Sequence, residues 1–310
     1  MDISNFVLLQ HSHDQEIIDL CKENHYFQRN DMVPCILNVS WNLKATNNVG
    51  VCLKNDDNHI VGFIGALDYT WEGKTIVNLS CGIIDSSLRG KGYASSFFRY
   101  AFSLGDVILD LSPTAQVHAM LLKHISGLKQ NTDYQLWIRP KRKKTRLFSS
   151  IDKNDVLACL PDWFAKVYDD NAKYQVHFIK ISDGENDCVF AYYTFSRYCV
   201  KGFEIIYCSH KAFFERYFSG VISEINKTEH AFVCFCDHLF CPNKSFSGNI
   251  SKFGTTGGTY AKRLLRLMIS RKGYIKTANR RLYWSKTADD FDFPLGYLYT
   301  EVVFYKSTIH

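Results

Sequence analysis

Residues 87–98 read SLRGKGYASSFF, with an arginine before two glycines that enclose a lysine. The residues before this stretch, 75–85, are typical of a β-strand. The residues after it have apolar side chains at helical spacing, namely Ala94, Phe97, Phe98, Ala101 and Phe102. A helix begins with unpaired backbone N–H groups and a partial positive charge, and glycines let an anion approach them closely. The stretch therefore predicts a site for a phosphate-bearing ligand at the start of a helix.

Two common phosphate-binding motifs do not fit this stretch. The P-loop pattern G-x-x-x-x-G-K-[S/T] is absent from it. The dinucleotide fingerprint needs a third glycine where Ser95 stands, and an acidic residue at the end of a strand roughly 20 residues further on, which the sequence lacks. Another kind of anion-binding turn is therefore expected.

The longer sequence IIDSSLRGKGYASSFF (83–98) resembles the acyl-coenzyme A signature of the GCN5-related N-acetyltransferase (GNAT) superfamily, Arg/Gln-x-x-Gly-x-Gly/Ala. Arg89, Gly92 and Ala94 fall at the fixed positions of this signature. The predicted order of elements over residues 1–138 is similar to that family's order: a strand, helices, three antiparallel strands, the signature helix, a strand and a helix. The resemblance implies a mixed α/β (α+β) sheet of the GNAT type. It also implies acetyl-CoA, or another acyl-CoA, as co-substrate.

The resemblance further implies which residues bind the cofactor. The backbone of Ile83 and Ile84 would pair with the pantetheine arm like an added strand. The backbone N–H groups of the following turn would bind the pyrophosphate, and these belong to Arg89, Gly90, Lys91, Gly92, Tyr93, Ala94 and Ser95. A plain strand-to-helix turn is the alternative interpretation of the same residues.

The reaction of that family is direct acyl transfer from a thioester to an amine, which must lose a proton before it attacks. The family often protonates the leaving thiolate with a tyrosine on the helix after the next strand. The predicted helix 114–125 has no tyrosine, and Lys123 stands at the expected place. The strand 75–85 has no carboxylate before Asp85. The chain thus departs from the family pattern at both positions.

The remaining polar candidates for catalysis are Asn78 and Ser80 on the strand and His118 on the later helix. His118 could shuttle a proton at neutral pH. A surface or helix-packing histidine is the alternative, and water could serve as the base because a thioester is already reactive.

The second half of the chain repeats the element order of the first. The pattern strand, strand, helix, strand occurs at 60–69, 75–85, 93–104 and 106–112, and again at 189–196, 202–208, 211–225 and 231–237. This order predicts two tandem copies of one domain, although no residue identities match. We expect a first domain over 1–138, a basic linker over 139–150 and a second GNAT-like domain over 151–310.

The second copy is expected to be degenerate. The turn that corresponds to the signature, YCSHKAFF (207–214), contains no glycine. We therefore expect this domain to bind no coenzyme, and instead to shape the acceptor pocket or to support the first domain.

Composition and charge limit the partners. The 310 residues are 46% hydrophobic and 22% charged, which is normal for a soluble globular protein, and the net charge of +6 does not by itself require nucleic acid. The run RPKRKKTR (139–146) is a solvated linker or a phosphate contact, and it lacks the interleaved aromatic residues of a nucleic-acid site. We expect no nucleic-acid partner.

The sequence has neither a secretory leader nor an apolar window of 18 residues, so no membrane partner is expected. Its 11 cysteines, scattered through apolar runs, favour a cytoplasmic location with reduced thiols.

A candidate metal site lies at four neighbouring residues, Cys234, Cys236, His238 and Cys241, but their spacing is not a standard zinc motif. Buried thiols are the favoured interpretation, and we expect no metal.

Together these observations predict a cytoplasmic, acyl-CoA-dependent N-acyltransferase that acts on the amine of a small metabolite. The stretches SWNLKATNNVG (40–50) and HIVGFIGAL (59–67) are similar to acyltransferase-like proteins with two such domains, some of them associated with surface-polysaccharide genes. That likeness implies an amino-sugar nucleotide as acceptor. The alternative is a catalytically inactive, acyl-CoA-binding or regulatory protein, which the missing tyrosine and carboxylate favour.

Overall fold

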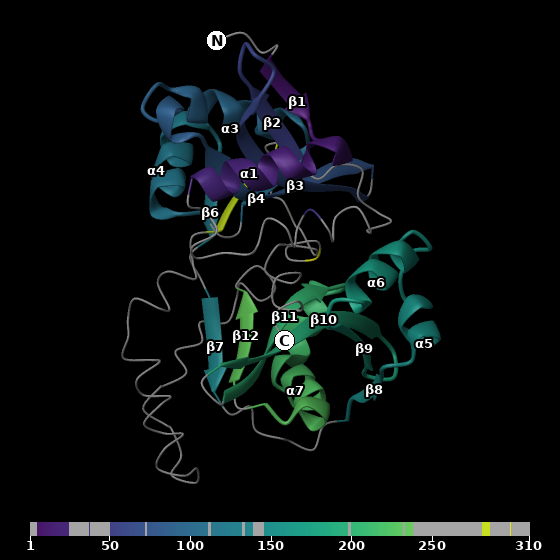
Figure 1. The fold of residues 1–310 in the computed structure, drawn as a ribbon. Coiled ribbons are helices and arrows are strands. Elements are labelled where there is room, and N and C mark those ends of the chain that lie inside the picture. Colours follow the sequence, from purple (N-terminus) through teal and green to yellow (C-terminus); the bar gives the residue numbers. More distant parts are fainter. Residues whose placement is uncertain are drawn as a thin grey trace. The chain divides into compact units, whose positions relative to one another are not determined.

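A computed structural model of the chain describes residues 5–24, 37, 50–71, 73–110, 113–131, 134–138, 146–197, 200–231, 233–237, 281–285 and 298. The chain forms two compact units (Figure 1). The first unit consists of Met1–Asn131, Arg280–Phe291 and Tyr299–His310, and the second of Thr132–Asn279 and Asp292–Leu298. Each unit contains its own mixed β-sheet.

The sheet of the first unit has the strand order β1-β2-β3-β4-β5-β13-β6. Its strands are β1 (Phe6–Leu8), β2 (Gly50–Lys54), β3 (Ile60–Trp71), β4 (Lys74–Ile84), β5 (Val107–Asp110), β13 (Arg281–Ser285) and β6 (Lys129–Asn131). Strands β1 to β4 are antiparallel neighbours, and β5 runs parallel to β4. Strand β13 pairs antiparallel with both β5 and β6. The mixed sheet of the expected fold class is therefore confirmed.

Helices cover both faces of this sheet (Figure 1). The described helices of this unit are η2 (His11–His13), α1 (Asp14–Glu23), η4 (Ser86–Leu88), α3 (Tyr93–Ser103) and α4 (Ala115–His124). Helix α3 buries the predicted apolar residues from Phe97 to Phe102 against Val51 and Val77. Helix α1 packs against Cys52 and Phe63. Because successive strand residues point to opposite faces, α1 and α3 lie on opposite sides of the sheet.

The sheet of the second unit has the order β7-β12-β11-β10-β9-β8. Its strands are β7 (Tyr134–Ile138), β8 (Phe148–Ser150), β9 (Val176–Ser182), β10 (Asp187–Arg197), β11 (Val200–Cys208) and β12 (Val233–Asp237). Strands β8 to β11 are antiparallel, β12 is parallel to β11, and β7 is antiparallel to β12. The helices are α5 (Lys153–Leu157), α6 (Phe164–Ala172) and α7 (Lys211–Glu229). The apolar face of α7, which includes Phe214 and Val221, is fully buried.

The two units share the same order of paired strands. In each, four antiparallel strands lead through a helix to a strand that runs parallel to the fourth. The fourth strand also has one extra residue in each unit. The register shifts between Phe63 and Gly65 opposite β4, and between Ala191 and Tyr192 opposite β11. The two units thus share this order of strands, and the duplication of one domain stays a prediction.

The boundaries of the units differ from the predicted division at residues 138 and 151. Strand β7 comes from the predicted first domain but belongs to the second sheet, and β13 comes from the predicted second domain but belongs to the first sheet. In both sheets the exchanged strand covers the open edge of the parallel strand. Such pairing between distant segments leaves no local signal in the sequence. Residues 139–145 of the predicted linker lie outside the described residues.

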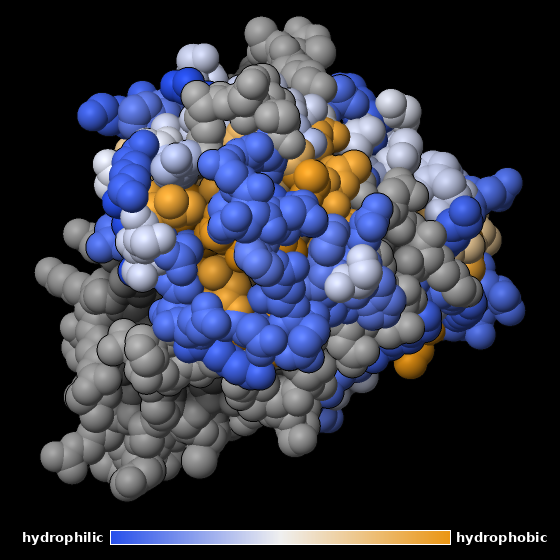
Figure 2. All heavy atoms as spheres, turned by 45° about the horizontal axis from the view of Figure 1, so that its top comes forward, coloured by the Kyte–Doolittle hydropathy of each residue, from blue (hydrophilic) through white to orange (hydrophobic). Residues whose placement is uncertain are grey.

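The surface of the described residues is mainly hydrophilic on the face that Figure 2 shows, with small hydrophobic areas between the polar side chains. None of the described helices is long and apolar enough to span a bilayer. Within the described ranges, no three His, Cys, Asp or Glu side chains are grouped so that they could bind a metal ion. His238 and Cys241 of the cysteine-rich stretch lie outside those ranges.

Candidate functional site

The predicted strand-to-helix turn lies between β4 and α3. After η4 the backbone passes through Gly90 and Gly92, whose φ angles are +76° and +85°. A Cβ atom at either glycine would meet no heavy atom within 4 Å. Glycine is therefore favoured here by the left-handed backbone and not by packing. The residues from Arg89 to Gly92 are exposed, so the turn is open to a ligand.

Asn24, at the end of α1, fixes the position of this turn. Its Oδ1 accepts hydrogen bonds from the Ser86 backbone N–H at 3.0 Å and from Arg89 Nη2 at 3.4 Å. Its Nδ2 donates to the Leu20 carbonyl at 3.0 Å and to the Asp85 carboxylate at 3.4 Å. The three bonds to Ser86, Arg89 and Asp85 tie the signature turn to the end of α1, which lies on the opposite side of the sheet from α3.

Arg89 holds the same turn through its side chain. Its Nε donates to the Ile84 carbonyl at 3.3 Å. Asp85 accepts from the Ser87 backbone N–H at 2.8 Å, and hydrogen bonds from the Ser87 hydroxyl and this N–H lower the pKa of the carboxyl. The arginine of the signature thus positions the turn in addition to contributing positive charge.

The N-terminus of α3 has no side-chain cap. Gly92 is its N-cap residue and has no side chain that could accept a hydrogen bond from the first turn, and no such bond from another described side chain is seen. The hydroxyl of Ser95 donates to the Gly92 carbonyl at 2.9 Å, so it does not block the backbone N–H groups. Uncapped N–H groups at the positive end of a helix dipole are a binding site for an anion.

Strand β4 extends beyond its described pairing with β5 on the way to this turn. The described parallel pairing of β4 with β5 runs from Ile76–Val107 to Leu79–Asp110, whereas β4 continues to Ile84. On its other side β4 stays paired with β3 up to the Gly62–Ile84 pair. Cys81 has a φ of +49° at the bulge that separates the two regions. The backbone of Ile83 and Ile84 therefore lies beyond the described pairing with β5, where an extended ligand could add as a strand.

Asn78 and Ser80 are buried neighbours on one face of β4, with 4% and 8% of their surface exposed. The Ser80 hydroxyl has no hydrogen-bond partner among the described residues, and a Cβ atom at Gly65 would lie 2.5 Å from it. Tyr69 on β3 lies on the same face of the sheet as Asn78, and burial raises the pKa of Tyr69 well above its ordinary value. Tyr69 therefore keeps its proton at neutral pH.

His118 lies on the other side of the sheet from these residues. It belongs to α4, whose Leu121 packs in the same cluster as Val77 and Leu79 of β4. Because strand residues alternate, Asn78 and Ser80 point away from that cluster. The structure thus brings Asn78 and Ser80 together and places His118 apart from them. Tyr69 is the polar neighbour that the sequence analysis missed.

In the second unit, a side chain caps the N-terminus of the helix that corresponds to α3. His210 is the N-cap residue of α7, and its Nδ1 accepts a hydrogen bond from the Phe213 backbone N–H at 3.0 Å. A side chain thus occupies the position that is open in front of α3.

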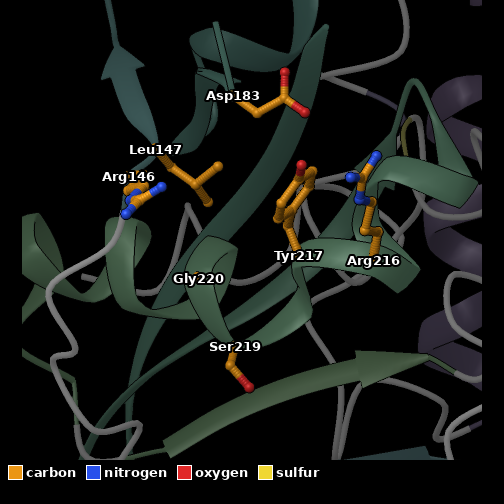
Figure 3. A pocket seen from close by; sticks show the side chains of 7 residues that line it. All are labelled: Arg146, Leu147, Asp183, Arg216, Tyr217, Ser219 and Gly220. Atoms are coloured by element: carbon orange, nitrogen blue, oxygen red, sulfur yellow. The ribbon is translucent and has the colours of Figure 1, made fainter. Parts of the chain in front are cut away.

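The second unit also has a hollow of about 400 Å³ beside α7 (Figure 3). It is lined by Arg146, Leu147, Asp183, Arg216, Tyr217, Ser219 and Gly220. The Asp183 carboxylate accepts from the backbone N–H groups of Glu185 and Asn186, at 3.0 and 2.8 Å, and from the Tyr217 hydroxyl. The Arg216 guanidinium lies 5.1 Å from the centre of the Tyr217 ring. The hollow therefore combines two guanidinium groups with one carboxylate.

No protein-family model and no curated protein matches this sequence. Among solved structures, the chain is similar to a GCN5-related N-acetyltransferase from Anabaena variabilis, with 11% identity, a TM-score of 0.46, and coverage of 74% of this chain and 64% of that one. A GCN5-related N-acetyltransferase from Kribbella flavida has 10% identity and a TM-score of 0.43, with coverage of 76% and 65%. A GNAT family acetyltransferase from Brucella melitensis, solved in complex with acetyl-CoA, has 12% identity and a TM-score of 0.29, with coverage of 36% and 76%.

The order of paired strands in the first unit is the order that the sequence resemblance implied, and the signature turn joins β4 to α3. The first unit has a GNAT-like fold. Within the first unit, the open N-terminus of α3 and the end of β4, which extends beyond its described pairing with β5, lie next to each other along the chain. A ligand that combines a phosphate group with an extended arm matches both features.

Proposed function

We propose that this protein is an acyl-CoA-dependent N-acyltransferase that moves an acetyl group to the amine of a small metabolite, with an amino-sugar nucleotide as the implied acceptor. The observation that carries the proposal is the uncapped N-terminus of α3 directly after the end of β4, which extends beyond its described pairing with β5. The exposed turn would bind the pyrophosphate through backbone N–H groups. The backbone of Ile83 and Ile84 would pair with the pantetheine arm.

The polar residues of β3 and β4 support the chemical step. Ser80 and Asn78 lie on the strand that leads to the proposed thioester position, and Tyr69 keeps its proton next to Asn78. In acyl transfer the attacking amine loses a proton, negative charge develops on the thioester oxygen, and the thiolate leaves. The Ser80 hydroxyl would donate a hydrogen bond to the developing oxyanion, and water would take the proton from the amine.

The second unit takes the supporting role in this proposal. His210 closes the start of α7, so the second unit would bind no coenzyme there. The protein would act in the cytoplasm, where acetyl-CoA is present and its cysteines remain reduced.

The proposal is tested with the purified full-length protein. Acetyl-CoA is first titrated by calorimetry, and the protein is then incubated with acetyl-CoA and a panel of amines that includes amino-sugar nucleotides. We expect binding and an amine-dependent conversion of acetyl-CoA to CoA, measured by mass spectrometry so that the thiols of the protein do not interfere. Failure to bind acetyl-CoA would overturn the proposal.

A second function, acyl-CoA binding without turnover, is favoured by the absence of a carboxylate on β4 between Thr75 and Ile84. This function predicts tight binding of acetyl-CoA but no CoA release with any amine. The same two measurements therefore distinguish the enzyme from the binding protein.

A further inference from the structure

Two buried thiols touch each other in the second unit, where β10 begins and β11 ends. The Sγ atoms of Cys188 and Cys208 are 3.7 Å apart, and the two residues are 0% and 2% exposed. The register places Phe190 opposite Cys208, so Cys188 and Cys208 are diagonal neighbours on the same face of the sheet. The two sulfur atoms are in contact and would have to come closer to reach the disulfide bond length of about 2.05 Å.

The surroundings of Cys188 favour its thiolate. The Ser209 hydroxyl accepts a hydrogen bond from the Val189 backbone N–H at 2.8 Å and donates to Cys188 Sγ at 3.6 Å. The first bond orients the hydroxyl, so its proton points at the sulfur. Burial alone raises the pKa of this thiol, but hydrogen bonds from Cys208 and Ser209 outweigh burial and lower it.

In two other buried cysteines of the chain, burial raises the pKa of the thiol. Burial raises the pKa of Cys21 and of Cys52 to about 12. Cys188 therefore combines two properties, a stabilised thiolate and a second thiol in contact with it. A reversible dithiol site needs both.

We propose that Cys188 and Cys208 form an oxidisable dithiol, a modification site at which a peroxide produces a disulfide between β10 and β11. The Cys188 thiolate attacks one peroxide oxygen, the O–O bond breaks, and hydroxide leaves and takes up a proton to give water. Cys208 sulfur then attacks the resulting sulfenic acid, and the S–S bond forms while a second water leaves. Two thiols are oxidised, and the peroxide is reduced to two waters.

The new bond would act on the start of α7. Cys188 Sγ lies 3.6 Å from the carbonyl oxygen of His210, the residue whose ring caps this helix. A disulfide at this point would hold the end of β11 to β10 and restrict the backbone that enters α7. This inference concerns the second unit and does not depend on acyl transfer.

The experiment treats the reduced full-length protein with hydrogen peroxide, unfolds it in an alkylating reagent without reductant, and maps its peptides by mass spectrometry. We expect the peptides of Cys188 and Cys208 to be linked, and dithiothreitol to reverse the link. Cys52 serves as the internal control and should remain an alkylated thiol. Recovery of Cys188 and Cys208 as alkylated thiols after the treatment would overturn the proposal.

Two further variants separate the chemistry from effects on folding. In Cys208→Ala, peroxide should leave Cys188 as a sulfenic acid that dimedone labels. In Cys188→Ala, Cys208 should not be labelled. Peroxide should also raise the melting temperature of the wild-type protein by several degrees without changing that of either variant. Equal labelling of the two single thiols would contradict the assigned order of attack.

Discussion

Gly92 and His210 occupy the same position in the two units, and only His210 closes the helix that follows it. Each lies between the fourth antiparallel strand and the next helix. Gly92 has a φ of +85° and no side chain that could accept a hydrogen bond, whereas His210 Nδ1 accepts from the Phe213 backbone N–H at 3.0 Å. This single difference leaves one helix N-terminus open to an anion and blocks the other.

We expect Gly92→Asp to abolish acetyl-CoA binding. The added carboxylate would lie at the proposed pyrophosphate position and repel it. A loss of at least about 100-fold in affinity is expected, which corresponds to about 2.7 kcal/mol. Isothermal titration of acetyl-CoA measures this change.

Gly73→Asp is the matched control for that variant. Gly73 has a φ of +75° and open space around its Cα, so the substitution imposes the same backbone strain at a site away from the signature turn. It should bind acetyl-CoA normally. Equal affinities of Gly92→Asp and the wild-type protein would place the cofactor elsewhere.

We expect Asn24→Ala to weaken cofactor binding without unfolding the protein. The side chain makes three hydrogen bonds to the turn before α3 and one to the Leu20 carbonyl of its own helix. Their loss should raise the KM for acetyl-CoA by about 10-fold and change kcat less, because the turn binds cofactor in both the ground and the transition state. Asn55→Ala is the control, since Asn55 Oδ1 accepts from the His59 backbone N–H in a turn elsewhere in the unit. A similar KM for both variants would mean that Asn24 does not position the site.

We expect Ser80→Ala to lower the transfer rate without lowering stability. The hydroxyl is buried and has no partner among the described residues, so its removal should leave the free energy of unfolding unchanged or slightly higher. The rate of acyl transfer should fall by about 100-fold if this hydroxyl stabilises the oxyanion. Single-turnover kinetics and urea unfolding measure the two quantities. An unchanged rate would remove Ser80 from the proposed chemistry.

We expect His210→Ala to destabilise α7 by about 1 kcal/mol, because the Phe213 backbone N–H loses its acceptor. The free energy of unfolding in urea measures this loss. His210→Asn should restore most of it, since asparagine is a good N-cap residue. If both variants were as stable as the wild-type protein, the cap would not stabilise the second unit.

Local patterns in the sequence predicted the helix α3, its buried face and the glycine turn before it. These features depend on residues within about 15 positions of one another, and the spacing of Phe97, Phe98, Ala101 and Phe102 contains that information. The pairing of β13 with β5 could not be predicted in this way, because it joins segments from opposite halves of the chain. The position of Tyr69 on the same face as Asn78 depends on the register of β3 and β4. The position of Asn24 next to the turn depends on the fold of α1 against the sheet. The glycine turn and the helix after it could thus be predicted from neighbouring residues, whereas the contacts between distant segments could not.

The stability of the protein should fall with pH between about 4 and 2, in part because of Asp183. Hydrogen bonds from the Asn186 backbone N–H and the Tyr217 hydroxyl lower the pKa of this carboxyl from 3.8 to about 2. A carboxyl with a lower pKa in the folded state stabilises the fold fully above its unfolded value, and this contribution is lost as the pH falls toward the folded value. Asp183→Asn should therefore be less stable than the wild-type protein at pH 7, and the difference should disappear near pH 2. Urea unfolding across this range measures the effect, with Glu185→Gln as a control that removes a charge from the same turn. A stability difference that stayed constant with pH would show that the ionised carboxylate of Asp183 does not stabilise the turn.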